Sequence, residues 1–553
     1  MNKFKIEQDN NRGRKVIATE ECRKGQLLFQ EESFVSIPLE SFLQDNKYCY
    51  LCCAPNVSGT IVNTATVADQ TTPAPQSTFI QCNYGCSMYF CGSDCANDMT
   101  HQLECSFVNK FIQSALDFNC DISMSLLGLR TIIKNKLDEE KYKQTVGNLS
   151  VQKDNFIKNN KAIIDRYYQL IDVIIDQLVK ENTAENILSI FNREEYTNVI
   201  CSIMINSFAG ISNDFRRLPI SNGFFYQAAL LNHNCEPNSL FFIQKNVLQM
   251  VAVQDVKPGQ QLLDCYTDLL TPTLERQKNL IKSKNFVCDC SRCTSPTEND
   301  RFFSSIECVF CSFTQGNNSN ATDANNTSKY YVSPKVIYNW ETQSFSTTWR
   351  CNNRSCSGQA NSREIMSLVQ QVDSFHELLN NKELLTVDSN TIDPYGQFLK
   401  QLSKFESGIL NKLHPNHYCC LLYNLRLSKV YEYLTSTADS LEYLLWSVSH
   451  YKEVSRIVES VIRHPSSEAI DSFYHLGRIS EKCLLSLIHQ RNAFTDQEMI
   501  DRLNVEIKKY LELIATSYQK SSDLATICYG DSNTKSMLLK ELSLKSNMNK
   551  LSL

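Results

Sequence analysis

The sequence lacks the features that would identify a membrane, secreted or nucleic-acid-binding protein. No apolar run reaches the roughly 18 residues of a transmembrane helix, so no membrane partner is expected. Residues 1–9 contain no apolar segment of the kind found in secretory signals. Basic residues form no long tract and the formal net charge is -5, so direct nucleic-acid binding is not expected.

Cysteine is the unusually abundant residue. The chain has 553 residues, which suggests several domains, and 24 of them are cysteine. Disulfide-rich secreted proteins are normally small, whereas this chain is large and spaces its thiols in pairs mixed with histidine. That pattern favours zinc binding in a reducing compartment, and therefore a cytoplasmic or nuclear location.

Three segments between positions 223 and 293 carry most of the reactive residue types. They read LNHNCEPN at 231–238, GQQLLDCY at 259–266 and FVCDCSRC at 286–293. Four thiols in these segments match the ligand number of a closed tetrahedral zinc site: Cys235, Cys288, Cys290 and Cys293. A metal that joined them would bring the polar octapeptide and the tyrosine into one pocket. A nucleophile formed by Cys235 and His233 is an alternative that conflicts with zinc ligation.

These segments resemble the SET domain, the fold of lysine methyltransferases. The family signature is Asn-His-x-Cys-x-Pro-Asn, then Gly-Glu-Glu-Leu and a tyrosine, then Cys-x-Cys-x-x-Cys. The first and third parts match at every fixed position, whereas Gln260 and Gln261 replace the two acids of the second. The plainer interpretation is a loop held by zinc with no catalysis.

The resemblance assigns roles within these segments. In the family the tyrosine of the signature is catalytic, which indicates Tyr266. The Asn-His pair holds the cofactor S-adenosylmethionine, so Asn232 and His233 inherit that role. The aromatic residue before the cysteine tail, Phe286, would stack on the adenine. The residues alone also allow a structural histidine and a buried core tyrosine.

A further part of the cofactor site is implied near the N-terminus. Residues 11–19 resemble the family's glycine loop, which cradles the cofactor and implies contacts from Arg12, Gly13 and Arg14. Lys15 replaces the second glycine of that loop. The apolar stretches on either side of Lys24-Gly25 predict a β-hairpin over residues 11–35.

Residues 205–209 resemble the family's Asn-Ser-Phe segment. There the asparagine touches the cofactor and the phenylalanine lines the lysine channel, which implies such roles for Asn206 and Phe208. The alternative is a helix end followed by a buried phenylalanine. Relatives often carry a second channel tyrosine where this chain has Lys284, whose charge would repel a substrate lysine unless it points to solvent.

Residues 49–105 contain a second group of metal-ligand residues. Seven cysteines and one histidine are spaced as Cys-x2-Cys, Cys-x3-Cys, Cys-x3-Cys and His-x3-Cys, enough for two zinc sites. The pattern resembles a MYND finger. Its cross-braced wiring implies one zinc on Cys49, Cys52, Cys91 and Cys95, and another on Cys82, Cys86, His101 and Cys105. Cys53 is an alternative to Cys52, and the polar insert 55–78 is expected to be disordered.

A fourth zinc site is suggested by two further cysteine pairs. They are Cys308 with Cys311, and Cys351 with Cys356. The low-complexity loop 315–329 lies between them and is expected to be flexible. The alternative is a set of free thiols near the surface.

The remaining segments are predicted to be helical. Apolar residues recur with a helical period in 106–205 and in 361–553. His464-Pro465 and Asn533-Thr534 are expected to separate helices near the C-terminus. Paired helices of this length suggest a tetratricopeptide-like solenoid, although no clean 34-residue consensus is present.

The predicted fold is therefore α+β, with a β-rich SET domain split by a MYND zinc finger and a helical insert. A cysteine-rich post-SET region and a C-terminal α-helical domain follow. The expected boundaries are 1–48 for the first part of the SET domain, 49–105 for the finger, 106–205 for the helical insert and linker, 206–270 for the core SET domain, 271–360 for the post-SET zinc region and 361–553 for the helical domain. This order resembles the SET-and-MYND-domain (SMYD) family over essentially the whole chain.

The resemblance implies an S-adenosylmethionine-dependent protein-lysine N-methyltransferase acting on histone or non-histone proteins. The alternative is a catalytically weak or inactive adaptor whose finger binds proline-rich peptides and whose helices bind a chaperone. The departures at Lys15, Gln260, Gln261 and Lys284 favour the adaptor, whereas the intact signature residues favour the enzyme. Cofactor binding separates the two hypotheses.

Overall fold

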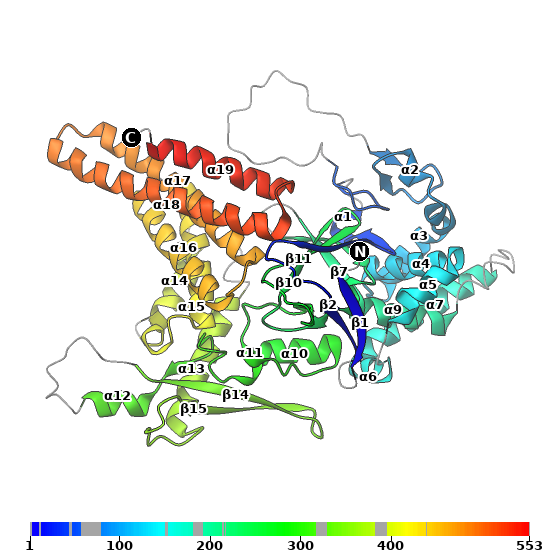
Figure 1. The fold of residues 1–553 in the computed structure, drawn as a ribbon, viewed down its shortest axis with the longest axis horizontal. Coiled ribbons are helices and arrows are strands. Elements are labelled where there is room, and N and C mark those ends of the chain that lie inside the picture. Colours follow the sequence, from blue (N-terminus) through cyan, green and yellow to red (C-terminus); the bar gives the residue numbers. More distant parts are fainter. Residues whose placement is uncertain are drawn as a thin grey trace. The chain divides into compact units, whose positions relative to one another are not determined.

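The computed structural model forms two compact units. It describes residues 3–9, 13–43, 47–56, 79–149, 153–180, 192–212, 215, 217–316, 329–381, 395–406, 408–437 and 440–551. The first unit comprises Met1–Asn232, Asn238–Asp264 and Asn279–Phe286. The second comprises His233–Pro237, Cys265–Lys278 and Val287–Leu553. Both helices and strands are present, as the α+β prediction requires (Figure 1). Most of the expected disordered insert 55–78 and loop 315–329, and Arg12, lie outside the described residues.

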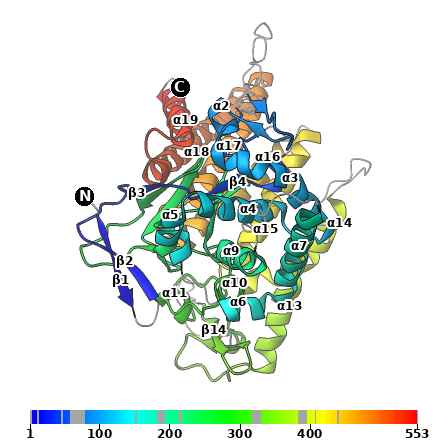
Figure 2. The same ribbon diagram turned by 90° about the vertical axis from the view of Figure 1, so that its right-hand side faces the viewer.

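The first unit contains several small antiparallel sheets, and two of them combine strands from both sides of the finger. Strand β1 (Phe4–Asp9) pairs with β2 (Gly13–Ala18), as Figure 2 shows. Strand β11 (Val247–Ala252) lies between β10 (Ser239–Gln244) and β3 (Leu27–Glu32). Strand β8 (Pro219–Phe224) lies between β4 (Ser36–Pro38) and β7 (Ser207–Ile211). Distant parts of the sequence therefore build one core.

The predicted hairpin over residues 11–35 is wrong. Strand β2 pairs with β1, and β3 pairs with β11 instead. The reason is burial: Leu28 and Phe29 of β3 are buried in the core, and Phe29 lies opposite the buried Met250 of β11. Strand β1 is largely exposed and polar, so its hydrophobic pattern gives no strong strand signal.

Helices fill the predicted insert 106–205. They are α3 (Met99–Asp117), α4 (Ile122–Leu137), α5 (Glu139–Gln144), α6 (Lys153–Asn159), α7 (Lys161–Lys180) and α9 (Arg193–Asn206). The predicted period in α7 is confirmed, since Ile164, Leu170, Ile171 and Ile174 are all buried. Asp98 and Asp121 cap the N-termini of α3 and α4 by accepting backbone N–H bonds.

Several further elements, most of them short, belong to the first unit or have residues in both units. They are α1 (Glu40–Leu43), β5 (Ile80–Gln81), β6 (Tyr89–Phe90), α2 (Ser93–Ala96), β9 (Asn232–His233), β12 (Leu263–Asp264) and α10 (Thr273–Lys284). The finger thus has little regular structure, in keeping with a module that depends on metal for its folding.

The second unit begins with the cysteine-rich region and ends with long helices. The former contains α11 (Ser291–Thr294), β13 (Ile306–Glu307), α12 (Val309–Gly316), β14 (Tyr331–Asn339) and β15 (Ser344–Cys351), the strands forming one antiparallel sheet. The latter are α13 (Arg363–Asn380), α14 (Gly396–Glu406), α15 (Tyr418–Thr437), α16 (Leu441–Val461), α17 (Ser467–Ala493), α18 (Gln497–Tyr529) and α19 (Thr534–Leu551).

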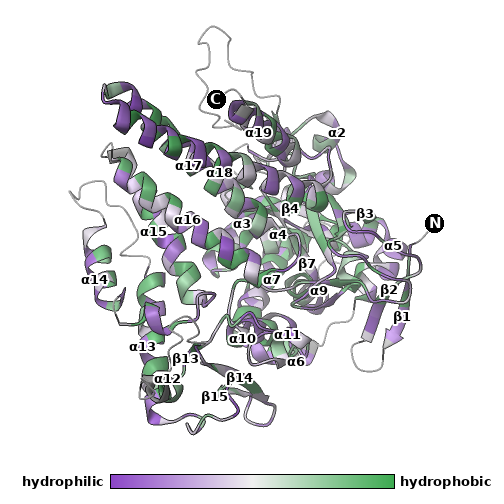
Figure 3. Cartoon of the chain, turned by 60° about the vertical axis from the view of Figure 1, so that its left-hand side comes forward, coloured by the Kyte–Doolittle hydropathy of each residue, from purple (hydrophilic) through white to green (hydrophobic). Residues whose placement is uncertain are grey.

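The long helices from α15 to α19 pack in sequence order, each against the next. Hydrophilic and hydrophobic residues alternate along α17 and α18, as Figure 3 shows. This pattern is typical of amphipathic helices in a stacked array. The predicted breaks are confirmed, because α16 ends before His464 and α19 begins at Thr534. Among the described residues, no helix combines the length and apolarity needed to cross a membrane.

Candidate active site and metal clusters

Four groups of side chains could each hold a metal ion. Within each group the four ligand atoms lie within 4.8 Å of one another, and all are cysteine sulfurs except one histidine nitrogen. The groups are Cys49, Cys52, Cys91 and Cys95; Cys82, Cys86, His101 and Cys105; Cys235, Cys288, Cys290 and Cys293; and Cys308, Cys311, Cys351 and Cys356. Tetrahedral sulfur and imidazole ligation fits zinc. The structure brings together the same sets that the spacing and the family wiring predict, with Cys52 rather than Cys53 in the first.

The histidine of the finger is supported by a buried carboxylate. Nε2 of His101 lies 3.2 Å from Sγ of Cys82, and Nδ1 lies 3.8 Å from Oε1 of Glu104. Burial alone would raise the pKa of Glu104, but Arg130 and His101 together outweigh it and hold that pKa below its usual value. At this distance the carboxylate acts on the imidazole through its charge, which favours a more basic ligating ring.

Arg130 connects this carboxylate to the strands of the first unit. Its guanidinium donates to Glu104, to the backbone oxygen of Ser36 in β4, and to the oxygen of Tyr50 at 3.0 Å. The same group lies 4.4 Å from the ring centre of Tyr50. The finger is therefore joined to the sheet by one buried charged group as well as by apolar packing.

The fourth group has the local geometry of a small zinc ribbon. Backbone N–H groups two residues after the ligands, at Asn353 and Gly358, each donate to a cysteine sulfur at 3.4 Å. Such bonds favour the thiolate form. Gly358 lies flat against Phe310, and a Cβ there would come within 2.3 Å of the ring. Glycine is thus required for this loop to close over the cluster.

The third group lies in the second unit together with the expected catalytic tyrosine. The backbone N–H of Tyr266 donates to Nδ1 of His233 at 3.0 Å. Since Nδ1 accepts, Nε2 carries the proton and donates to Sγ of Cys235 at 3.3 Å. The rings of His233 and Tyr266 lie 5.3 Å apart. Both ring nitrogens of His233 are thus engaged within the protein, which favours the structural interpretation of its side chain.

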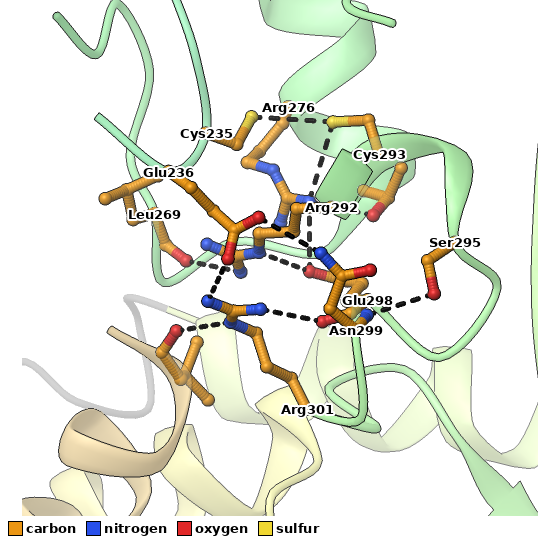
Figure 4. A network of polar contacts seen from close by, with 12 residues as sticks. Cys235, Glu236, Leu269, Arg276, Arg292, Cys293, Ser295, Glu298, Asn299 and Arg301 are labelled. Carbon is orange, nitrogen blue, oxygen red and sulfur yellow. Dashed lines mark hydrogen bonds and ion pairs between the residues drawn. The ribbon is translucent and has the colours of Figure 1, made fainter. Parts of the chain in front are cut away.

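A network of buried charges lies beside Cys235 and Cys293 (Figure 4). Arg276, Arg292 and Arg301 are each exposed by 2% or less, and Glu298 is equally buried. Arg276 lies 3.0 Å and Arg292 lies 2.8 Å from the same oxygen of Glu298. Burial would raise the pKa of Glu298, but these two arginines outweigh it and lower that pKa below its usual value.

The backbone at Glu298 and at the two residues after it has the left-handed conformation. Glu298, Asn299 and Asp300 have φ values of 53°, 55° and 59°. A left-handed conformation costs a residue with a side chain roughly 1–2 kcal/mol. No spacing rule identifies such a turn, so sequence analysis missed the whole network.

The other expected site residues belong to the first unit. The side-chain amide of Asn232 donates to the backbone oxygen of Arg14 at 2.9 Å, which brings the signature segment to the glycine-loop strand. Gly13 has a φ of 75° and open space around its missing Cβ. The guanidinium of Arg14 donates to the oxygen of Asn148 at 2.8 Å. Phe286 is half-buried at the end of its segment.

Asn206 and Phe208 lie at the junction of α9 and β7. Nδ2 of Asn206 is buried and finds no hydrogen-bond partner in the part of the chain that the structure describes. The ring of Phe208 packs edge-on against Phe225 and Phe241, with centroids 6.1 and 5.0 Å away. The aromatic rings around Phe208 therefore lie close in sequence to the side-chain amide of Asn206, whose N–H donor is unused among the described residues.

Lys284 is tied to the same junction. Its Nζ donates to the backbone oxygen of Ile205, and burial lowers its pKa to about 8, with Asp264 opposing the shift. The side chain therefore does not point to solvent. The sequence predicted no repulsion of a substrate lysine only if it did, so that condition is not met.

Comparison with known proteins assigns the fold around these residues. Residues 13–267 match the family model described as SET domain. This chain contains a SET domain. The match includes β2, β11 and the LNHNCEPN segment, so the resemblance found in the sequence is confirmed, together with the expected fold class.

Several proteins with SMYD in their names are similar to this chain. SET domain-containing protein SmydA-8, isoform B, of Drosophila melanogaster is 26% identical over 298 residues, covering 54% of this chain and 58% of that protein. N-lysine methyltransferase SMYD2 of Homo sapiens is 23% identical over 220 residues, covering 37% and 46%. Histone-lysine N-methyltransferase SMYD3 of Homo sapiens is 35% identical over 100 residues, covering 18% and 22%. The chain spans about half the length of the first two relatives.

Proposed function

We propose that this chain is a protein-lysine N-methyltransferase that uses S-adenosylmethionine. The observation that carries the proposal is the SET match over 13–267, within which Asn232 bonds the strand of Gly13 and Arg14. The names of SMYD2 and SMYD3 state lysine methyltransferase activity for those relatives. None of the 24 cysteines forms a disulfide, which supports a reducing location in cytoplasm or nucleus.

The residues of the first unit fit the cofactor. The buried, unpartnered Nδ2 of Asn206 is a donor that needs an acceptor, which the carboxylate or ribose of the cofactor offers. Gly13 exposes backbone that a ligand can approach closely. Phe286, half-buried, has a ring on which adenine can stack. When bound, S-adenosylmethionine supplies a methyl group on a sulfonium.

The chain's own residues prepare the acceptor amine. A lysine with the usual pKa near 10.4 is charged at neutral pH and has no free lone pair. The aromatic wall of Phe208, Phe225 and Phe241 excludes water, and desolvation favours the neutral amine. The ammonium proton leaves to water before attack. The hydroxyl of Tyr266 orients the amine, and its backbone is held by His233.

Protein substrates with a target lysine follow from this reaction, and we propose two further classes of partner. A cavity of about 430 Å³ at the finger has a mixed polar and apolar lining, formed by Gln81, Cys86, Ser87, Met88, Tyr89, Asn109, Ile112 and Gln113. Met88, Tyr89 and Ile112 would give a proline-rich peptide apolar and aromatic contacts, and the amides of Gln81, Asn109 and Gln113 would bond its carbonyls. The stacked helices α15–α19 would bind a chaperone. An adaptor without catalysis would keep both surfaces, so the cavity also supports that second candidate function.

Calorimetric titration of S-adenosylmethionine into zinc-loaded protein tests the proposal, followed by labelled-methyl transfer to a panel of proteins. We expect saturable binding, and Tyr266→Phe should leave binding intact while transfer falls at least tenfold. Tyr84→Phe changes an exposed tyrosine of the finger and serves as the matched control. Absence of binding at millimolar cofactor would leave the adaptor as the better description.

A further inference from the structure

The arginine network of Figure 4 reaches from a metal ligand to the end of a long helix, all within the second unit. At one end, Nη2 of Arg276 lies 3.8 Å from Sγ of Cys293. At the other, Nε of Arg301 donates to the backbone oxygen of Val461 at 2.7 Å. Val461 is the last residue of α16. The two ends share one carboxylate residue, Glu298.

The connections in this network centre on Arg301, which is buried, and on Glu236, whose side chain is 29% exposed. Arg301 donates to the backbone oxygen of Glu298 at 3.0 Å and to Oε1 of Glu236 at 2.7 Å. Glu236 directly follows the ligand Cys235. The second oxygen of Glu236 accepts from Ser291 at 2.8 Å and Asn299 at 3.0 Å. One guanidinium thus holds the residue beside a metal ligand, the left-handed turn and the helix end.

A zinc–thiolate centre at the cysteines offsets the excess positive charge of this network. Three buried arginines outnumber the two carboxylates by one positive charge. Four thiolates around a zinc ion carry a net charge of −2 beside them. A buried charge without compensation is strongly unfavourable. The arginines and the zinc–thiolate centre therefore stabilise one another.

The helix end gains from the same guanidinium. The last carbonyls of an α-helix lack partners within the helix and carry partial negative charge. Arg301 donates a hydrogen bond to the carbonyl of Val461. Phe303, two residues after Arg301, packs among Val454, Ile457 and Ala469. The segment that carries Glu298 and Arg301 is therefore also the segment against which the C-terminus of α16 packs.

We propose that Arg301, with Glu236 and Glu298, is a positioning group that couples zinc occupancy of the Cys235–Cys293 site to the docking of the C-terminus of α16. Loss of zinc should release the helix end, and loss of the helix-end contact should weaken zinc binding by the same factor, because coupling between two sites is reciprocal. The proposal does not depend on methyl transfer.

Two site-resolved measurements on the full-length protein test it. Alkylation of Cys288, Cys290 and Cys293 under a chelator, followed by peptide mapping, reports zinc loss from this site alone. Hydrogen–deuterium exchange of residues 457–462 reports docking of the helix end. In the wild type, chelation should speed exchange at 457–462. Arg301→Lys should speed both alkylation and exchange by about tenfold, the size expected for one buried charge-assisted hydrogen bond.

A matched control and a milder variant complete the design. Arg363→Lys makes the same change at an exposed arginine of the second unit, far in sequence from residues 457–462, and should alter neither rate. Glu236→Gln keeps the shape of the side chain and removes its charge, so it replaces Arg301→Lys if that variant fails to fold. Unchanged exchange at 457–462 after chelation of the wild type would overturn the proposal. So would a variant that loosens the helix end while alkylation stays within twofold.

Discussion

Arg130 and Glu104 form a buried two-point ion pair that supports the zinc finger. Nε of the guanidinium lies 3.0 Å from Oε2 of the carboxylate, and the exposed fraction of each side chain is 2% or less. The carboxylate in turn faces His101. The stability of this zinc site therefore rests on a charge contributed by α4, outside the finger.

Replacing Arg130 by methionine should destabilise the first unit by about 3–5 kcal/mol, because it leaves the buried charge of Glu104 unpaired. Urea unfolding followed by circular dichroism measures the change. Lys143→Met breaks an exposed pair with Glu139 and should have little effect. A double variant with Glu104→Gln should recover part of the loss; no recovery would show that the pair itself is not the cause.

Zinc content should be four ions per chain. Cys351→Ser and Cys356→Ser each remove one ligand of the ribbon and should lower the count to three, since the other clusters share no ligand with it. Native mass spectrometry counts the ions. Cys420→Ser changes a cysteine outside the clusters and should leave four. A wild-type count of three that stays at three in Cys351→Ser would exclude the ribbon as a zinc site.

The pKa of Lys284 predicts a pH dependence of stability. Its folded-state pKa of about 8 lies below the usual value of about 10.4, so the unfolded chain binds more protons between these pH values. The stability of the wild type should therefore rise relative to Lys284→Met from pH 8 to pH 10.4, by about 1–3 kcal/mol after allowance for solvent screening. Below pH 8 the difference should be constant. Denaturant unfolding of both proteins across pH 7–10.5 checks the sign, and a relative fall would contradict the buried state of this amine.

Gly358→Ala should destabilise the ribbon by about 1–3 kcal/mol, because the new methyl group would overlap the ring of Phe310. The readout is the rate of zinc loss from the cysteine pairs at 308–311 and 351–356. Gly408→Ala places a methyl group in open space and serves as control. If both variants lose zinc at the wild-type rate, Phe310 has room to move.

The metal ligands could be predicted from the sequence because their spacing is local and their chemistry is restricted. Cys49 and Cys52, for example, must lie close together in space whatever the fold. The pairing of Cys82 with His101 needed the family wiring, since spacing alone leaves the partner open. Where pairing is non-local, as for β3 with β11, local alternation gave the wrong partner.

The charged networks could not be predicted in the same way. Arg301 contacts Val461, which is 160 positions away in the sequence. Its neighbour Glu298 reaches the site only through a backbone conformation that glutamate seldom adopts. Likewise, the sequence suggested a cofactor role for His233 but could not show that both of its ring nitrogens bind within the protein.

The split sheets also set the order in which the chain can fold during synthesis. Strand β3 ends at Glu32, whereas its partner β11 begins at Val247. At about 5–20 residues per second, the ribosome needs on the order of ten seconds or more to deliver the partner. During that time β3 and β4 are unpaired edges with apolar side chains, which chaperones must shield from other nascent chains. The finger's ligands emerge in between, so zinc can fold the inserted module before the domain that encloses it exists.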